Sequence, residues 1–399
     1  MRCSVLALAA LLPAAGTADR VAFTRAPGGA LAAQIQPPNT HYLYAPSAIR
    51  LDESGPVSAW ACGGGEGPFD SLYFAALADS PVAPEPVLVP RQLDAWVDGH
   101  HACAPSVVRM AVPSLFNGSQ MLRAFYECSP NFYDAATGER FEGFAQVCAA
   151  ASADGRVWLK SVGGLAFAPA DSAPALPVVN ASARVRANCM FAFVDGRFVG
   201  NFSNNGACAD LGLNYGSGHP SAVLHPLTGE LWLFYYSSEG AWEDRGVFVV
   251  RSNDGVSFGA PLRTNVQNPM EVRAVLDAAS GNVSFIGTLG LYFDHYFAYS
   301  ADGLAWTWAG SGPDEALVLG EAVAGHCACP AQPSIVADAG GVLRVGAHGV
   351  LSAAIIADEG FYSKAEGGPA GGCYSAIEDS SRGATWALYA MLGNFSFAP

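Results

Sequence analysis

The chain is predicted to be an all-β protein, a five-bladed β-propeller of four-stranded antiparallel blades. One stretch has the pattern of four short strands joined by tight turns, and the same signals recur in a fixed order along the chain. Composition agrees, because 45 glycines, 26 prolines and a hydrophobic share of 51% in 399 residues fit many short strands linked by turns.

The clearest repeat unit runs from Tyr215 to Phe258. Apolar and aromatic residues fill 221–224, 230–237 and 246–252, and a fourth strand begins near Phe258. Pro226-Leu227-Thr228-Gly229 forms the first turn, and Asn253-Asp254-Gly255 forms the last. The stretch therefore predicts one antiparallel blade.

Three markers repeat in the same order. The units open with a Pro-Ser pair, or with Pro-Met in one case, at Pro46-Ser47, Pro105-Ser106, Pro220-Ser221, Pro269-Met270 and Pro333-Ser334. A turn signal follows each opening, at Glu53-Ser54-Gly55, Asn117-Gly118, Thr228-Gly229, Ser280-Gly281 and Gly340-Gly341. A closing motif, S-x-D-G-x-x-(W/F), begins at Ser152, Ser252 and Ser300 and is weakened at Ser380.

These openings favour five blades. The longest interval, from Pro105 to Pro220, contains MFAFVDGRFVGNFS, a hairpin pattern with Asp195-Gly196 at its turn. A sixth blade there is the alternative, but neither an opening nor a closing marker accompanies it. We interpret residues 159–214 as an insertion in a single propeller domain that spans 19–399.

Residues 1–18 have the layout of a secretory signal peptide, with Arg2, then the apolar run VLALAALL, then small residues up to Ala18. No later apolar run approaches the ~20 residues of a membrane helix. We therefore expect a secreted protein without a transmembrane segment.

Two further features fit the secretory route. Five N-x-S sequons predict a glycoprotein, at Asn117, Asn180, Asn201, Asn282 and Asn394. Of ten cysteines, Cys3 leaves with the signal peptide, so nine remain and one stays unpaired. Candidate disulfides are Cys128 with Cys148, Cys189 with Cys208, and one from Cys327 or Cys329 to Cys373.

The net charge of −15 argues against nucleic acid or an anionic membrane as a partner, because both require clustered positive charge. The sequence does not predict an oligomeric state.

In a propeller, the innermost strands of all blades converge at one face, which is the default binding site. Counting along the repeat places two sets of polar residues there. The first set opens the inner strands: His41, Asp98, His100, His101, His219, Glu271 and His326. The second set lies between strands two and three: Asp70, Glu239, Trp242, Glu243, Asp244, Asp294 and His295.

The S-x-D-G-x-x-(W/F) turns fall between strands three and four, away from that face. We expect the aspartate to accept hydrogen bonds from turn N–H groups, the glycine to take a positive φ, and the aromatic ring to pack between blades. Their predicted role is structural.

The openings YAPSAIR, CAPSVVR, YGSGHPSAVL and QPSIVAD, together with the closing motifs, resemble those of the five-bladed propeller glycosidases, the arabinanase, β-xylosidase and invertase-like group. The similarity covers roughly residues 40–390. It implies an Asp before the proline of blade one, as base or nucleophile, and a Glu acid in a later blade. This chain departs from that pattern, because Ala45 and Ala104 stand before the first two prolines, and Glu271 alone matches the acid by place and type.

Glycoside hydrolysis needs two carboxyl groups. The prediction is therefore a carbohydrate-active protein in which Glu271 is the general acid and Asp70, Asp98 or Asp294 supplies the second carboxylate. The candidate sugar-binding residues are His41, His101, His219, His326, Trp60, Trp242 and Arg273, and no cofactor is required.

Two alternatives remain open. A propeller without a catalytic pair would bind glycans and not hydrolyse them. The histidines of four blades, His41, His101, His219 and His326, could instead form a ring that holds a metal ion in the central channel.

Overall fold

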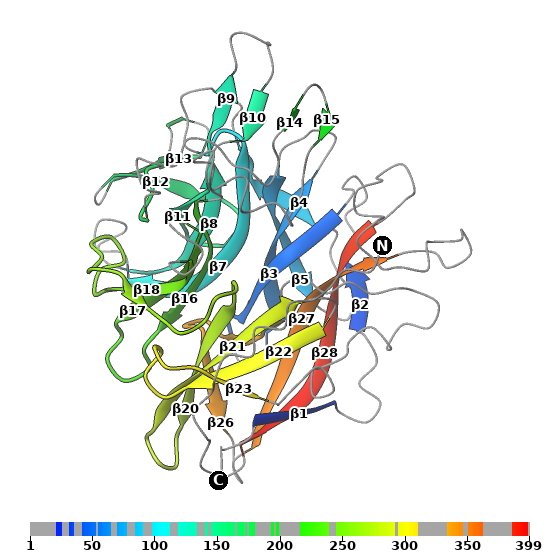
Figure 1. Cartoon of the computed structure of the whole chain (residues 1–399), viewed down its shortest axis with the longest axis vertical. Coiled ribbons are helices and arrows are strands. Elements are labelled where there is room, and N and C mark those ends of the chain that lie inside the picture. The colour runs from blue at the N-terminus through cyan, green and yellow to red at the C-terminus, as the bar shows by residue number, and fades with distance from the viewer. Residues whose placement is uncertain are drawn as a thin grey trace.

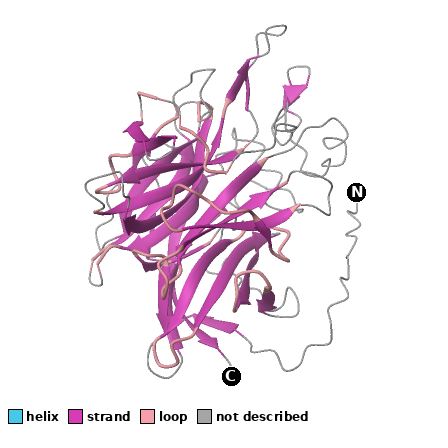
Figure 2. Ribbon diagram, turned by 90° about the vertical axis from the view of Figure 1, so that its left-hand side faces the viewer, coloured by secondary structure: helices cyan, strands magenta, loops and turns pink. Residues whose placement is uncertain are grey.

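The structure is a computed structural model. It describes residues 21–25, 32–35, 42–52, 55–64, 70–77, 84–90, 98–111, 119–133, 140–142, 145–163, 166–170, 172–173, 175–179, 193–194, 197–198, 216–238, 245–291, 294–309, 333–345, 350–361 and 385–397. Within these ranges the chain forms strands and loops and no helix (Figure 2). The all-β prediction is confirmed.

Four large sheets surround a common centre (Figure 1). The second sheet contains β7 (His101–Ala111), β8 (Gln120–Ser129), β11 (Gln146–Ser152), β12 (Leu159–Gly163) and β13 (Ala166–Pro169). The third contains β16 (Ser217–Leu224), β17 (Leu231–Ser237), β18 (Gly246–Ser252) and β19 (Leu262–Arg263). The fourth contains β20 (Glu271–Asp277), β21 (Val283–Leu291), β22 (Asp294–Ser300), β23 (Thr307–Ala309) and β26 (Val342–Val345).

The first sheet has ten strands and includes the first and last described strands. Its main path contains β24 (Ser334–Ile335), β27 (Val350–Phe361), β28 (Thr385–Phe397), β3 (Tyr42–Arg50), β4 (Val57–Gly64), β5 (Asp70–Leu77) and β6 (Glu85–Leu88). Off this path, β1 (Val21–Arg25) and β2 (Ala32–Ile35) pair with β28, and β25 (Ala337–Asp338) pairs with β3. The strand nearest the N-terminus is thus hydrogen-bonded to the last strand.

The first strands of successive sheets lie side by side. β3 contacts β7, β7 contacts β16, and β16 contacts β20. Arg273 of β20 then donates a hydrogen bond to the Ile335 carbonyl of β24, which lies in the first sheet and contacts β3. Sheets related in this way form a ring, which is the arrangement of a β-propeller.

The hydrogen bonding joins the strands into four large sheets, where the sequence predicted five. One short parallel pairing, between β28 and β3, causes the difference. Trp386 of β28 pairs with Tyr42 of β3, and β25 pairs with the end of the same strand at Ile49 and Arg50. The β28–β3 pairing merges the first and last groups of strands into one sheet, and the β25–β3 pairing adds β25 to it.

Hydrophobic side chains fill the spaces between neighbouring sheets. Trp60 on β4 is fully buried, and its ring lies near Phe74 and Trp158. Trp232 stacks on Phe285 between the third and fourth sheets. Because both faces of a blade are covered, all eight residues of β4 are buried and the strand shows no alternation of polar and apolar residues.

The S-x-D-G-x-x-(W/F) turns have the predicted geometry at all three full copies. In the second copy, the Asp254 carboxylate accepts the N–H groups of Val256 and Ser257 at 2.8 and 2.7 Å. The Gly255 N–H donates to the Ser252 hydroxyl at 2.8 Å, and Gly255 has a φ of +69°. The same bonds recur around Asp154 and Asp302, so the expectation of a structural role is confirmed.

One predicted disulfide is present, between Cys128 and Cys148 within the second sheet. A second, between Cys62 on β4 and Cys103 on β7, links the first and second sheets and was not predicted. The other cysteines of the predicted pairs, at 189, 208, 327, 329 and 373, lie outside the described residues.

Within the predicted insertion, β12 and β13 extend the second sheet, so the strands of that sheet continue beyond residue 159. Further on, β14 (Phe193–Val194) and β15 (Arg197–Phe198) pair in the antiparallel sense, as the hairpin pattern predicts. A second small hairpin joins β9 (Asn131–Tyr133) and β10 (Arg140–Glu142). In the part of the chain that the structure describes, no helix is long and apolar enough to cross a membrane.

The close packing of the turn glycines gives a prediction. A Cβ on Gly303 (φ +72°) would lie 2.6 Å from the buried Trp232 ring, whereas a Cβ on Gly229 (φ +71°) would meet nothing within 4 Å. Alanine disfavours a positive φ, so each Gly→Ala variant should lose about 1–2 kcal/mol of unfolding free energy. Gly303→Ala should lose about 1–3 kcal/mol more because the ring must move. Equal losses of unfolding free energy in denaturant titrations would show that the turn does not pack as described.

Candidate binding pocket

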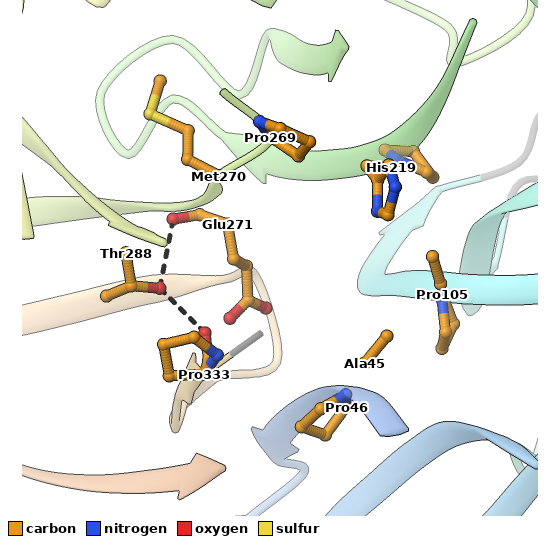
Figure 3. Close-up of a pocket in the computed structure, with 11 residues that line it drawn as sticks. Ala45, Pro46, Pro105, His219, Pro269, Met270, Glu271, Thr288 and Pro333 are labelled. Atoms are coloured by element: carbon orange, nitrogen blue, oxygen red, sulfur yellow. Dashed lines mark hydrogen bonds between the residues drawn. The ribbon is translucent and has the colours of Figure 1, made fainter. Parts of the chain in front are cut away.

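A pocket lies where the openings of the inner strands converge (Figure 3). Its empty volume is about 360 Å³, a figure that includes space open to solvent. The lining residues come from every sheet and share their position at a strand opening or beside one: Ala45, Pro46, Ala104, Pro105, His219, Pro220, Pro269, Met270, Glu271, Thr288 and Pro333.

Three of these openings share an unusual backbone conformation. Ala45, Ala104 and His219 each precede a proline and have φ values of +49°, +40° and +48°. The strand register shifts at the same place in β3, β7 and β16. A left-handed residue that is not glycine costs roughly 1–2 kcal/mol, and a following proline restricts it further. Such strain is typical of functional sites and persists only where surrounding contacts hold it.

The serine after each proline bonds to the neighbouring inner strand. Its hydroxyl oxygen accepts a backbone N–H from the next inner strand around the ring. The donor is the residue directly after the equivalent serine of that strand, or after Glu271 on β20. The pairs are Ser47 with Val107 (3.0 Å), Ser106 with Ala222 (2.8 Å), Ser221 with Val272 (2.6 Å) and Ser334 with Ala48 (3.0 Å). We call these four bonds the serine links.

Glu271 occupies the serine position of β20, and its carboxylate makes the contact to the next inner strand that the serine hydroxyl makes elsewhere. It accepts a hydrogen bond from the backbone N–H of Ile335 and one from the Ser334 hydroxyl at 2.9 Å. Oε1 also forms an ion pair with Nη2 of Arg273, and the side chain is 12% exposed. Glu271 is therefore both a contact between inner strands and part of the pocket wall.

Burial raises the pKa of Glu271 from its ordinary value of 4.5 to about 7, although Arg273 and the hydrogen bonds from Ser334 and Ile335 lower it. A carboxyl group that titrates near neutral pH can hold a proton where ordinary carboxyl groups are ionised. This property is required of a general acid.

Acidic and imidazole side chains alternate from the first sheet, through the second, to His219 on the third. Nδ1 of His101 lies 3.2 Å from Asp70, and its Nε2 lies 3.3 Å from Oε1 of Glu127. Oε2 of Glu127 accepts the backbone N–H of His219 at 2.9 Å and lies 3.9 Å from Nε2 of the same residue. This polar chain runs from β5 through β7 and β8 to the pocket lining on β16.

Sequence reasoning missed Glu127. The only signal is a charged residue near the end of the apolar strand β8, next to Cys128. A carboxylate that is 5% exposed requires partners, and these are far away in sequence. The repeat pattern did not single out the position.

Two predicted site residues are buried away from the pocket. Trp60 is 0% exposed, and its indole N–H donates to the Gly155 carbonyl at 2.8 Å, so it packs between sheets and cannot stack on a sugar. Asp98 is 0% exposed and lies 2.5 Å from Nζ of Lys160, with the Tyr126 hydroxyl also bonded to it, so it is not positioned as a base for a ligand in the pocket.

Arg273 also departs from its predicted sugar-binding role. Its side chain is 1% exposed and donates to the Ile335 and Val272 carbonyls and to Ser334. The guanidinium is therefore engaged within the protein, and it positions Glu271.

The remaining predicted site residues stay predictions. Asp294 is the first residue of β22, while His41, Trp242 and His326 lie outside the described residues. The proposed four-histidine metal ring thus has two described members, His101 and His219. Among described side chains, one group of three could hold a metal ion, Cys62, Cys103 and Asp70. Its two sulfurs are joined as a disulfide, which leaves no thiolate ligand.

Comparisons with known proteins give similarity at the level of structure. No protein-family model matches the chain, and no curated protein matches its sequence. A GH62 hydrolase in complex with xylotriose is 11% identical, with a TM-score of 0.50, and the alignment covers 94% of this chain and 97% of that one. At an identity this low, structural likeness shows a shared fold. The chain has the propeller fold found among glycoside hydrolases.

Two further solved structures are similar at a lower score. A family 117 glycoside hydrolase from the marine bacterium Zobellia galactanivorans is 9% identical over 94% of this chain and 90% of that one, with a TM-score of 0.48. A thermostable family-43 glycoside hydrolase is 11% identical over 89% and 90%, with a TM-score of 0.46.

The raised pKa of Glu271 predicts a pH dependence of stability. Between about pH 4.5 and 7 the folded state holds a proton that the unfolded state has released, so rising pH removes stability, on the order of 3 kcal/mol in all. Glu271→Gln has no such proton. The unfolding free energy of the wild type should therefore fall relative to that of the variant across this window, as measured by denaturant titrations at several pH values. A constant difference would contradict the raised pKa.

Proposed function

We propose that this chain is a secreted carbohydrate-active protein with a glycoside hydrolase-like propeller, and that its central pocket binds a saccharide. The convergence of strained strand openings with Glu271, His219 and Thr288 in a single concave site is the observation that carries the proposal. Apolar pockets with a few polar groups are typical of ligand sites.

Secretion is supported by the signal-peptide pattern of residues 1–18, by five sequons and by two disulfides. Asn282 is exposed in the turn between β20 and β21, at the end of β20 opposite to Glu271. A glycan at this sequon would leave the pocket open.

We also infer five blades. The ten-stranded sheet divides into β3–β6 and the group of β24, β27 and β28 with β1, each of which is antiparallel internally. The four serine links and the Glu271–Ile335 contact make five connections between five inner strands. One connection per pair of neighbouring blades fits a five-membered ring.

Binding without hydrolysis is the function that the pocket favours. Hydrolysis requires two carboxyl groups on either side of the scissile bond. Ala45 and Ala104 present methyl groups at the first two openings, and Glu271 is the one carboxyl group among the described lining residues. Asp70 and Glu127 lie behind the histidines and contact them.

Hydrolysis is the second candidate, favoured by the pKa of about 7 at Glu271. In that case Glu271 would donate the proton to the leaving oxygen, and Asp70 or Asp294 would act as base or nucleophile. The geometry required is a separation of about 5–5.5 Å for retention or 6.5–9.5 Å for inversion.

The two candidates give different results with a panel of oligosaccharides. We expect calorimetry to detect binding by the wild type, with no release of reducing ends. If release is observed, it should be lost in Glu271→Gln, whereas Glu85→Gln, at a partly exposed residue outside the pocket lining, should behave as the wild type. Release that survives Glu271→Gln would reject Glu271 as the acid, and the absence of binding to every saccharide would overturn the proposal.

A further inference from the structure

We propose that the central pocket prefers a saccharide that carries an anionic group, a carboxylate or a sulfate ester, and that His219 recognises this group. The inference rests on the proposed saccharide-binding function and specifies its ligand class. It follows from the distribution of charge among the residues around the pocket.

The backbone makes His219 equivalent to Ala45 and Ala104. All three residues precede a proline, have φ between +40° and +49°, and line the same pocket. Figure 3 shows Ala45, His219 and Glu271 around one space. Two of the three equivalent positions therefore offer only a methyl group, and the third offers an imidazole.

The carboxylates near the pocket contact a guanidinium or an imidazole, and Asp70 and Glu127 share one imidazole, which can offset at most one of their two charges. Arg273 pairs with Glu271, and the guanidinium itself is buried. His101 lies between Asp70 and Glu127 within 3.3 Å of each. Although the whole chain has a net charge of −15, Glu271, the one carboxyl group among the described lining residues, is paired with a guanidinium.

Glu127 fixes the position of His219. It accepts the His219 backbone N–H at 2.9 Å, and a Cβ on Gly218 would lie 2.0 Å from Oε2 of the same carboxylate. Glycine at position 218 thus allows the carboxylate to approach the strained opening. The His219 side chain is 25% exposed and lines the pocket.

An imidazole in this setting can donate a charge-assisted hydrogen bond to an anionic ligand group. Such bonds are roughly twice as strong as neutral ones. A carboxylate at position 45 would instead repel an anionic ligand. Ala45 has only a methyl group there, so the side chains at positions 45 and 219 both favour an anionic ligand.

The experiment uses two pairs of tetrasaccharides that differ only in charge. One pair is an oligogalacturonide and its methyl ester, and the other is a sulfated galactan fragment and its desulfated form. Calorimetry should show that the wild type binds the anionic member of at least one pair tenfold or more tightly than the neutral member. Which pair responds identifies carboxylate or sulfate as the recognised group.

The variant His219→Ala should lose this preference while it still binds the neutral members. Alanine is suited to this position because Ala45 and Ala104 adopt the same conformation. Ala45→Asp should weaken binding of the anionic member selectively. His225→Asn, which lies just beyond the far end of β16 and outside the pocket lining, is the control and should bind as the wild type does. Circular dichroism melts confirm that each variant is folded.

Equal affinity for both members of both pairs would overturn the inference and leave the saccharide-binding function intact. A charge preference that persists in His219→Ala would also overturn it. If no saccharide of either pair or of the wider panel binds, the proposed function itself fails, and the inference fails with it.

Discussion

The structure depends on the hydrogen bonds that join the inner strands around the pocket. An inner strand has a neighbour in its own blade on one side only, so backbone N–H groups on its other edge need partners. The serine links supply them, with the Ser106 hydroxyl bound to Ala222 N–H and the Ser221 hydroxyl to Val272 N–H. The proline that precedes each serine has no N–H to satisfy. The Pro-Ser openings therefore have a structural reason, and at three of them the residue before the proline, Ala45, Ala104 or His219, lines the pocket.

Glu271 has both this structural role and a functional one. At the other openings a serine hydroxyl makes the link to the next inner strand. On β20 the longer glutamate carboxylate makes it, and the buried Arg273 balances the charge of that carboxylate. Arg273 also donates to the Ile335 carbonyl, which ties the same two strands together. The pocket thus contains a carboxyl group of raised pKa without an uncompensated buried charge.

The features that sequence predicts well are local. The turn around Asp254 is held by bonds that span three residues at most, and the repeat of Pro-Ser openings marks each inner strand. The Cys128–Cys148 disulfide joins neighbouring strands of one sheet. Counting along a repeat gives a position within a strand, but it does not show which neighbouring blade covers the side chain. For this reason Trp60 and Asp98 were assigned to the site although both are fully buried, and Glu127 was missed. The Cys62–Cys103 disulfide was missed because it joins two different groups of strands.

The claim that a saccharide binds where the inner strands converge can be tested directly by amide hydrogen exchange with and without bound oligosaccharide. Binding there should stabilise the serine links, so exchange should slow at the N–H groups of Ala48, Val107, Ala222 and Val272, while the outer strands β6, β19 and β23 remain unchanged. Protection confined to the outer strands, with no change at these four amides, would show that the sugar binds elsewhere.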